Sequence, residues 1–99
     1  MYRLGAFGFL YDGEGLAGNQ AIYDMMKALE WVKENIGQFY GDPDRITIFG
    51  ESAGSWSVFH HILSPPSSSL FKAGIGQSGT MISGLADTSF SRLVDTGQI

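Results

Sequence analysis

Two short strand-like runs separated by a helical stretch constrain this chain more than any other feature of its sequence. The first run, residues 45–49, is rich in β-branched and aromatic residues and ends at Gly50. Residues 53–63 follow with a helical pattern ended by Ser64-Pro65-Pro66, and residues 70–76 predict a second, weaker strand. Strands that alternate with helices pair in parallel, because each helix returns the chain to the same end of the sheet. The sequence therefore predicts an α/β fold with a parallel sheet.

A long amphipathic helix is the clearest element of the N-terminal half. Asn19 is expected to cap its start, and the helix, about 18 residues long, is expected to stop near Gly37. Its apolar residues recur at steps of three and four, which places them on one stripe: Ile22, Met25, Met26, Leu29, Val32 and Ile36.

The segments around these elements are expected to be irregular. Residues 1–4 are predicted as the end of a strand, and the closely spaced glycines of residues 5–18 predict a loop. Residues 41–44 have the composition of a turn, and the three serines at residues 67–69 predict a further loop. Residues 80–99 become polar and irregular, and no structure is assigned to them.

Composition excludes several classes of function. The 99 residues carry 10 Asp and Glu against 6 Lys and Arg, a net charge of −4 without a basic run, so a nucleic-acid partner is not expected. No apolar stretch approaches the roughly 18 residues of a membrane span. The chain has no cysteine, which excludes a disulfide scaffold and a thiolate metal site. No leader-like segment is expected at the N-terminus, so composition leaves the localisation open.

The pentapeptide from Gly50 to Gly54 (Gly-Glu-Ser-Ala-Gly) matches the pattern G-x-S-x-G and is the candidate catalytic motif of the chain. It follows a predicted strand and opens a predicted helix, which is the position of a nucleophile elbow. Ser52 must then adopt a strained backbone conformation at the tip of the turn. Side chains at Gly50 and Gly54 are expected to collide with the strand or helix packed there, and glycine avoids this collision.

Such an elbow holds the Ser52 hydroxyl at the carboxyl end of the sheet. The amide N–H of Ala53, at the start of the following helix, would point at the carbonyl oxygen that becomes negative during acyl transfer, giving half of an oxyanion hole. The alternative interpretation is a serine that only caps the helix.

Seven segments in order and spacing resemble the type-B carboxylesterase and cholinesterase family of α/β-hydrolases. These segments are residues 2–10, Gly18-Asn19 with Asp24, and residues 28–36, 41–47, 49–55, 63–65 and 70–79. The resemblance runs from Tyr2 to about Gly79. It implies a partial α/β-hydrolase fold with parallel strands and crossover helices, in which residues 1–79 are an internal piece of a catalytic domain and residues 80–99 stay unassigned.

The resemblance also implies the reaction and its site. Ser52 would attack a small-molecule carboxylic ester and form an acyl-enzyme, a histidine would take its proton, and an acidic residue would orient that histidine. Neither a metal nor an organic cofactor is implied. Ser52 and Ala53 match the family directly, and the family resemblance implies secretion or the lumen of the endoplasmic reticulum.

Two further residues carry over as supporting groups. Glu51 corresponds to the family's carboxylate beside the nucleophile, which helps to set the electrostatics of the site; the alternative is a solvated acid at a helix N-terminus. Ser78 resembles a serine that hydrogen-bonds the far side of the triad, and the alternative is a plain turn serine. Asp24 and Trp31 resemble helix residues whose role is structural.

The chain departs from a complete enzyme in what it lacks. The family order is Ser, acid, His, yet no histidine follows His61. His60 and His61 lie eight and nine residues beyond Ser52 on the predicted helix, roughly 12 Å or more away at 1.5 Å per residue, and are expected to be packing or surface residues. The chain alone is therefore expected to be inactive. The rival interpretations are a cholinesterase-like adhesion module, which typically lacks the nucleophile, and a truncated product.

Overall fold

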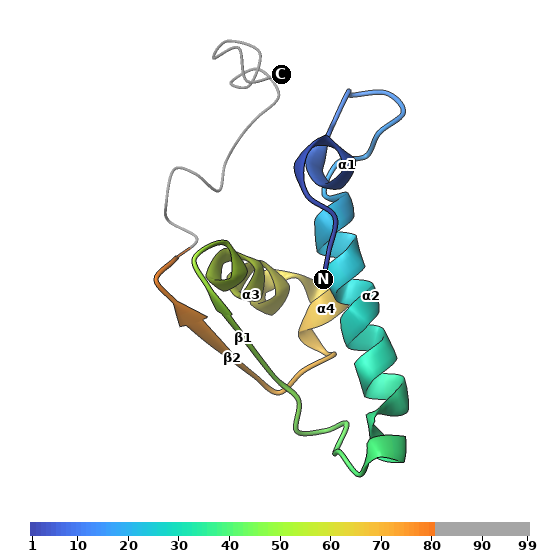
Figure 1. Cartoon of the computed structure of the whole chain (residues 1–99), viewed down its shortest axis with the longest axis vertical. Coiled ribbons are helices and arrows are strands. Elements are labelled where there is room, and N and C mark those ends of the chain that lie inside the picture. The colour runs from blue at the N-terminus through green and yellow to red at the C-terminus, as the bar shows by residue number, and fades with distance from the viewer. Residues whose placement is uncertain (81–99) are drawn as a thin grey trace.

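The computed structural model describes residues 1–80 (Figure 1). Along the chain its elements are α1 (Gly5–Phe9), α2 (Gln20–Asn35), the 3-10 helix η1 (Ile36–Phe39), β1 (Thr47–Glu51), α3 (Ala53–Leu63), α4 (Pro65–Ser68) and β2 (Ala73–Gln77). The predicted long helix, the helix after the pentapeptide and both strands are confirmed. The first strand lies two residues further toward the C-terminus than predicted, and the second begins three residues later and ends one residue later.

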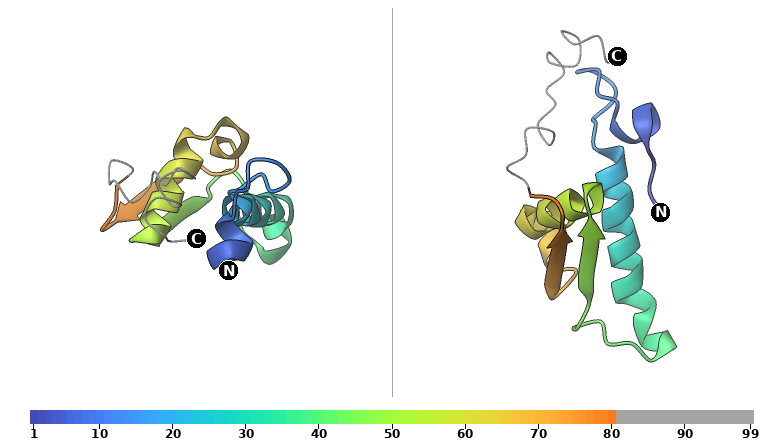
Figure 2. Two further views of the ribbon diagram at one scale, coloured as in Figure 1. Left: turned by 90° about the horizontal axis from the view of Figure 1, so that it is seen from above. Right: turned by 60° about the vertical axis from the view of Figure 1, so that its left-hand side comes forward.

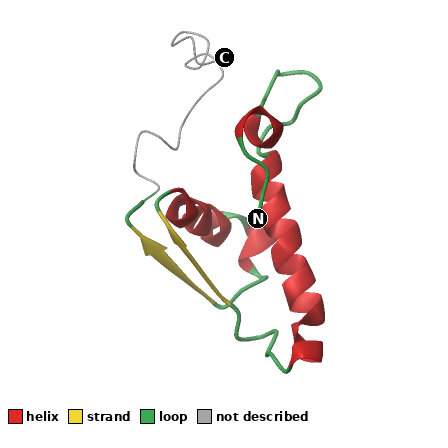
Figure 3. Ribbon diagram, in the orientation of Figure 1, coloured by secondary structure: helices red, strands yellow, loops and turns green. Residues whose placement is uncertain are grey.

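The two strands form a parallel sheet, as the alternation of strand and helix predicts. Thr47 pairs with Ala73 at one end of the ladder and Glu51 with Gln77 at the other. The helix α3 connects the strands and packs on one face of the sheet (Figure 3). Both strands therefore end on the side of the molecule where α3 begins, which is the edge at which open α/β sheets place their sites.

Glycines in β2 allow α3 to lie close to the sheet. A Cβ atom at Gly74 would lie 3.0 Å from both the Ile62 and Val58 side chains, and one at Gly76 would lie 2.6 Å from the Ser55 hydroxyl oxygen. Because side chains alternate across a strand, Ile75 lies on the opposite face, beside its partner Phe49. There Phe49 is 75% and Ile75 53% exposed, so that face of the sheet has no cover within residues 1–80.

The helix α2 begins where the sequence predicts, but Asn19 acts differently from a normal N-cap. Asn19 adopts a left-handed conformation with φ 59°, and its side chain makes no capping hydrogen bond. Its backbone carbonyl accepts the N–H groups of Ile22 (2.9 Å) and Tyr23 (3.1 Å) instead. The helical path then continues as η1 to Phe39.

The N-terminal segment departs from prediction. Residues 1–4 do not form a strand, and residues 5–9, expected as loop, form α1. Arg3 donates its backbone N–H and two guanidinium N–H groups to Asp24 of α2, at 2.7 to 3.0 Å, which holds this segment beside the helix. Gly8 makes the helical turn possible here, because a Cβ atom would clash with the Arg3 backbone and lie 3.2 Å from Ala21. Figure 2 shows α1 beside the N-terminal end of α2.

The serine run is also more regular than predicted. Residues 65–68 form α4, with proline in its first turn, where proline needs no hydrogen-bond partner for its nitrogen. Ser67 is buried, and its hydroxyl donates to the carbonyl of His61 at 3.2 Å. Residues 65–68 are therefore an ordered connection after α3, and they pack against the end of that helix.

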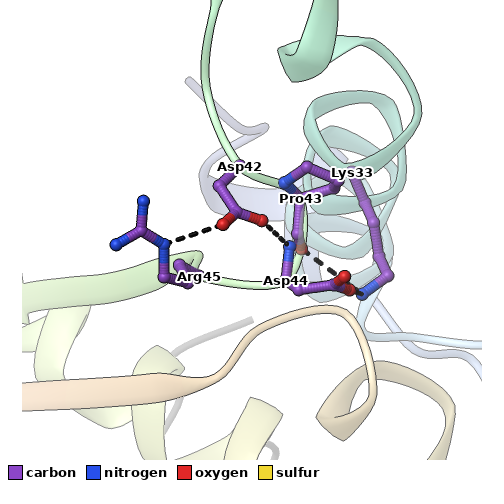
Figure 4. Close-up of polar contacts among 5 residues, drawn as sticks. All are labelled: Lys33, Asp42, Pro43, Asp44 and Arg45. Carbon is purple, nitrogen blue, oxygen red and sulfur yellow. Dashed lines mark hydrogen bonds and ion pairs between the residues drawn. The ribbon is translucent and has the colours of Figure 1, made fainter.

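The predicted turn before β1 is built around one carboxylate (Figure 4). Asp42 accepts the backbone N–H of Asp44 at 2.9 Å and the guanidinium Nε–H of Arg45 at 2.7 Å. These bonds keep the pKa of the Asp42 carboxyl below its ordinary value, the backbone N–H of Asp44 contributing most. Lys33 of α2 reaches the same turn, 3.9 Å from the Asp44 carboxylate.

Candidate active site

Ser52 lies at a sharp turn between the last residue of β1 and the first residue of α3. Its backbone has φ 53° and ψ −115°, a strained conformation that serine rarely adopts. Ser52 is exposed, and its side chain makes no capping bond to α3. The turn thus has the conformation expected of a nucleophile elbow, and the hydroxyl is not used as a helix cap.

The two glycines of the pentapeptide have different roles. A Cβ atom at Gly50 would collide with the carbonyl group of Gly54 and lie 2.8 Å from the Gly54 Cα atom, so the predicted collision exists at this position. A Cβ atom at Gly54 would have no neighbour within 4 Å, so the prediction for Gly54 is wrong in this structure. Gly54 borders an open groove between α2 and α3, whereas Gly50 lies under the first turn of α3.

Backbone hydrogen bonds hold the elbow on both sides. The Ser52 N–H donates to the carbonyl of Gln77, the last residue of β2, at 2.9 Å. The Ser52 carbonyl accepts the N–H of Trp56 at 3.1 Å, which is the first intrahelical bond of α3. The position of Ser52 therefore depends on both neighbouring elements.

The other predicted site residues lie around this turn. Ala53 is the first residue of α3, where backbone N–H groups have no partner within the helix. Glu51 ends β1 and is exposed, and Ser78 directly follows β2 with φ 56°. Because Glu51 pairs with Gln77, the segments that carry Glu51, Ser52 and Ser78 lie at the same edge of the sheet.

The two histidines lie on α3, away from the elbow. The His60 Nδ1 atom is 2.7 Å from the carbonyl oxygen of Trp56. His61 is 3% exposed, and neither ring nitrogen has a hydrogen-bond partner within the described residues. Burial, and to a smaller extent the neighbouring His60, lowers the pKa of His61. His61 is a packing residue, as its position along the helix predicts.

His61 also borders the groove that separates α2 from β1 and α3. This groove has a volume of about 220 Å³ and is lined mostly by apolar side chains, including Met25, Leu29, Ile48 and Val58. Residues 1–80 contain no group of three or more His, Asp or Glu side chains placed to hold a metal ion. No helix in this part of the chain is both long and apolar enough to cross a membrane.

Sequence reasoning did not single out the residues of α3 that contact the segment after β2. Ser55 is fully buried, and its hydroxyl donates to the carbonyl of Gly79 at 2.7 Å. A Cβ atom at Gly79 would lie 2.8 Å from the Trp56 indole nitrogen. Gly74, Gly76 and Gly79, in and just after the second strand, could have indicated this contact. Glycines in a strand often mark the close approach of another element.

Comparison with known proteins identifies the relatives of this chain. Residues 1–94 match the model of the carboxylesterase family. The chain belongs to that family. The match extends beyond Gly79, where the resemblance of the individual segments ends. An acetylcholinesterase of Leptinotarsa decemlineata is 43% identical over 99% of the chain, and venom carboxylesterase-6 of Apis mellifera is 51% identical over 88%.

The same region of the family also occurs in a relative that is not named as an esterase. Human neuroligin-2 is 53% identical over 83% of this chain. The chain spans 17% of the beetle acetylcholinesterase, 16% of the bee carboxylesterase and 10% of neuroligin-2. It therefore corresponds to a small part of each relative.

Proposed function

We propose that this chain is the nucleophile-bearing segment of a serine hydrolase that cleaves small-molecule carboxylic esters. The observation that carries the proposal is Ser52 itself: a serine at φ 53°, exposed, between a parallel strand and the helix that follows it. This backbone conformation costs free energy of order 1–3 kcal/mol, and a functional site is the usual reason for such strain.

In the proposed reaction, the Ser52 hydroxyl oxygen forms a bond to the ester carbonyl carbon while its proton passes to a histidine base. The carbonyl oxygen becomes negative and accepts a hydrogen bond from the Ala53 N–H at the start of α3. The alcohol leaves with the proton. Water, which gives its proton to the same base, then attacks the acyl-serine and releases the carboxylic acid and the free Ser52 hydroxyl. Glu51 would place negative charge beside the nucleophile, and the Ser78 hydroxyl would hydrogen-bond the triad from the end of β2.

The base and the acid of the triad would come from parts of a longer protein. His60 and His61 do not qualify, because they lie more than two helical turns beyond Ser52, and His61 is buried. The chain covers only a small share of each relative's length, which supports the proposal that the base and the acid come from other parts of the protein.

The test is covalent labelling of the full-length protein with an activated fluorophosphonate, followed by peptide mapping. We expect modification of Ser52 and loss of ester hydrolysis in parallel, and a Ser52→Ala variant should show neither labelling nor turnover. An active protein that is labelled elsewhere, with Ser52 untouched, contradicts the assignment. A folded protein that neither reacts nor hydrolyses esters favours a binding module.

A further inference from the structure

The segment that follows β2 is held to the elbow by two hydrogen bonds, one on each side of Ser78. The Gln77 carbonyl accepts the Ser52 N–H at 2.9 Å, and the Gly79 carbonyl accepts the Ser55 hydroxyl at 2.7 Å. Ser78 between them has φ 56°, outside the conformations that serine prefers. A strained residue keeps its conformation only when its neighbours fix it, and these two bonds, together with the pairing of Gln77 with Glu51, fix the backbone around Ser78.

We propose that Ser55 is a positioning residue for Ser52. Its hydroxyl fixes Gly79, which fixes the turn at Ser78 and thereby the Gln77 carbonyl that holds the Ser52 amide. This inference rests on the proposed function, because it assigns Ser55 a part in the reaction of Ser52. Ser55 does not touch the substrate in this proposal and acts only through the backbone of residues 77–79.

The surroundings of Ser55 make the hydroxyl difficult to replace. The residue is 0% exposed, so water does not reach the Gly79 carbonyl from the side of Ser55. A Cβ atom at Gly76 would lie 2.6 Å from the Ser55 oxygen, so the glycine of β2 leaves space for this hydroxyl and little more. The Trp56 indole lies closely against Gly79, where a Cβ atom would be 2.8 Å from the indole nitrogen. Without the hydroxyl, the carbonyl of the half-buried Gly79 loses this partner and the turn can shift.

The chain offers a matched control for this experiment. Ser67 is also buried, at 1% exposure, and its hydroxyl also donates to a backbone carbonyl, that of His61 near the far end of α3. Replacing either serine by alanine removes one buried hydroxyl: that of Ser55 donates to Gly79, and that of Ser67 is shared between the carbonyls of His61 (3.2 Å) and Ser64 (3.4 Å). The two variants should therefore lose similar stability, and only Ser55→Ala alters a contact of the elbow.

The experiment compares Ser55→Ala, Ser55→Cys and Ser67→Ala in the full-length protein, with kcat and KM for a chromogenic ester and the rate of fluorophosphonate labelling as readouts. We expect Ser55→Ala to lower kcat and the labelling rate about three- to tenfold with little change in KM, because a misplaced nucleophile slows acylation more than binding. Ser55→Cys keeps a weak donor, although its sulfur is larger than the oxygen, so it should lose less activity than Ser55→Ala and tests the contact where Ser55→Ala fails to fold. Ser67→Ala should keep kcat near normal, and thermal unfolding monitors the stability of all three variants.

The outcomes separate this inference from the proposed function. If Ser52 is not labelled in the unaltered protein, the proposed function fails and the role of Ser55 fails with it. If Ser52 is labelled at the same rate in the unaltered protein and both Ser55 variants, only the positioning role is overturned. Equal losses of kcat in Ser55→Ala and Ser67→Ala also overturn it, because they would reflect stability alone.

Discussion

Gly50 and Gly54 lie two residues on either side of Ser52, and the sequence pattern treats them alike. The structure separates them. A side chain at Gly50 must displace the backbone of Gly54 at the start of α3, whereas a side chain at Gly54 enters the groove beside α2. Only the first glycine allows the close strand-to-helix turn that places Ser52.

This difference predicts that Gly50→Ala damages the full-length protein more than Gly54→Ala. The first change should destabilise it by roughly 1–3 kcal/mol, as overpacking usually does, and slow labelling of Ser52 about tenfold or more. Gly54→Ala is the matched control, since it adds the same methyl group one turn away. Thermal unfolding and fluorophosphonate labelling of both variants provide the measurement. Equal effects would show that the pattern constrains both positions for another reason.

At the scale of elements, one ion pair joins the N-terminal segment to α2. The carboxylate of Asp24 accepts three hydrogen bonds from Arg3, and the guanidinium contributes most to lowering its pKa from 3.8 to about 2. A carboxyl group with a lowered pKa stabilises the folded state above its ordinary pKa. That contribution is lost as the pH falls from about 4 toward 2.

Asp24→Asn should therefore lower the stability of the full-length protein at neutral pH and change its pH dependence. The difference between the two proteins should be constant above about pH 4.5 and shrink toward pH 2, because the unaltered carboxylate becomes protonated there. Urea unfolding of both proteins between pH 7 and pH 2 measures this difference. The comparison removes the titration of all other carboxyl groups, which both proteins share. Stability curves that remain parallel throughout would rule out the Arg3 contact as the cause.

The elements that sequence predicts well are those specified by their own residues. The apolar stripe of α2 and the β-branched run of β1 are local patterns, and both elements form, β1 two residues further toward the C-terminus than predicted. The short helix α1 depends on contacts from Arg3 to Asp24, 21 positions along the chain, which no local pattern contains. The elbow was predictable because its motif, strand and helix are contiguous. The buried contact of Ser55 with Gly79 was not, because it depends on the register of β2 against α3.

At the scale of the molecule, residues 1–80 bury few apolar side chains. Ala21 and Val58 are the buried apolar side chains of residues 1–80, and large apolar residues such as Phe7, Phe49 and Leu63 are well exposed. The two strands each have an edge without a strand partner in this part of the chain. Exposed apolar patches and open sheet edges favour association with other chains. In a longer protein of the carboxylesterase family, further elements would supply this cover.

These features predict that the 99-residue chain, expressed alone, hydrolyses a chromogenic short-chain ester no faster than its Ser52→Ala variant. A serine hydroxyl is a weak nucleophile until a base takes its proton, and His61 is buried while His60 lies two turns along α3. The Ala53 amide does not replace a base. Amide hydrogen exchange on the same samples reports whether α3 and the sheet form, because a chain with so small a core should exchange rapidly or associate.

Hydrogen exchange shows how an absence of ester hydrolysis by the 99-residue chain should be interpreted. A protected, monomeric chain without turnover shows that the elbow forms and that only the base is missing. Rapid exchange together with no turnover shows instead that the elbow depends on the rest of the protein for its geometry. Turnover that depends on Ser52 in a protected monomer would contradict the prediction and require a base within these residues, with His60→Gln and His61→Gln as the variants that identify it.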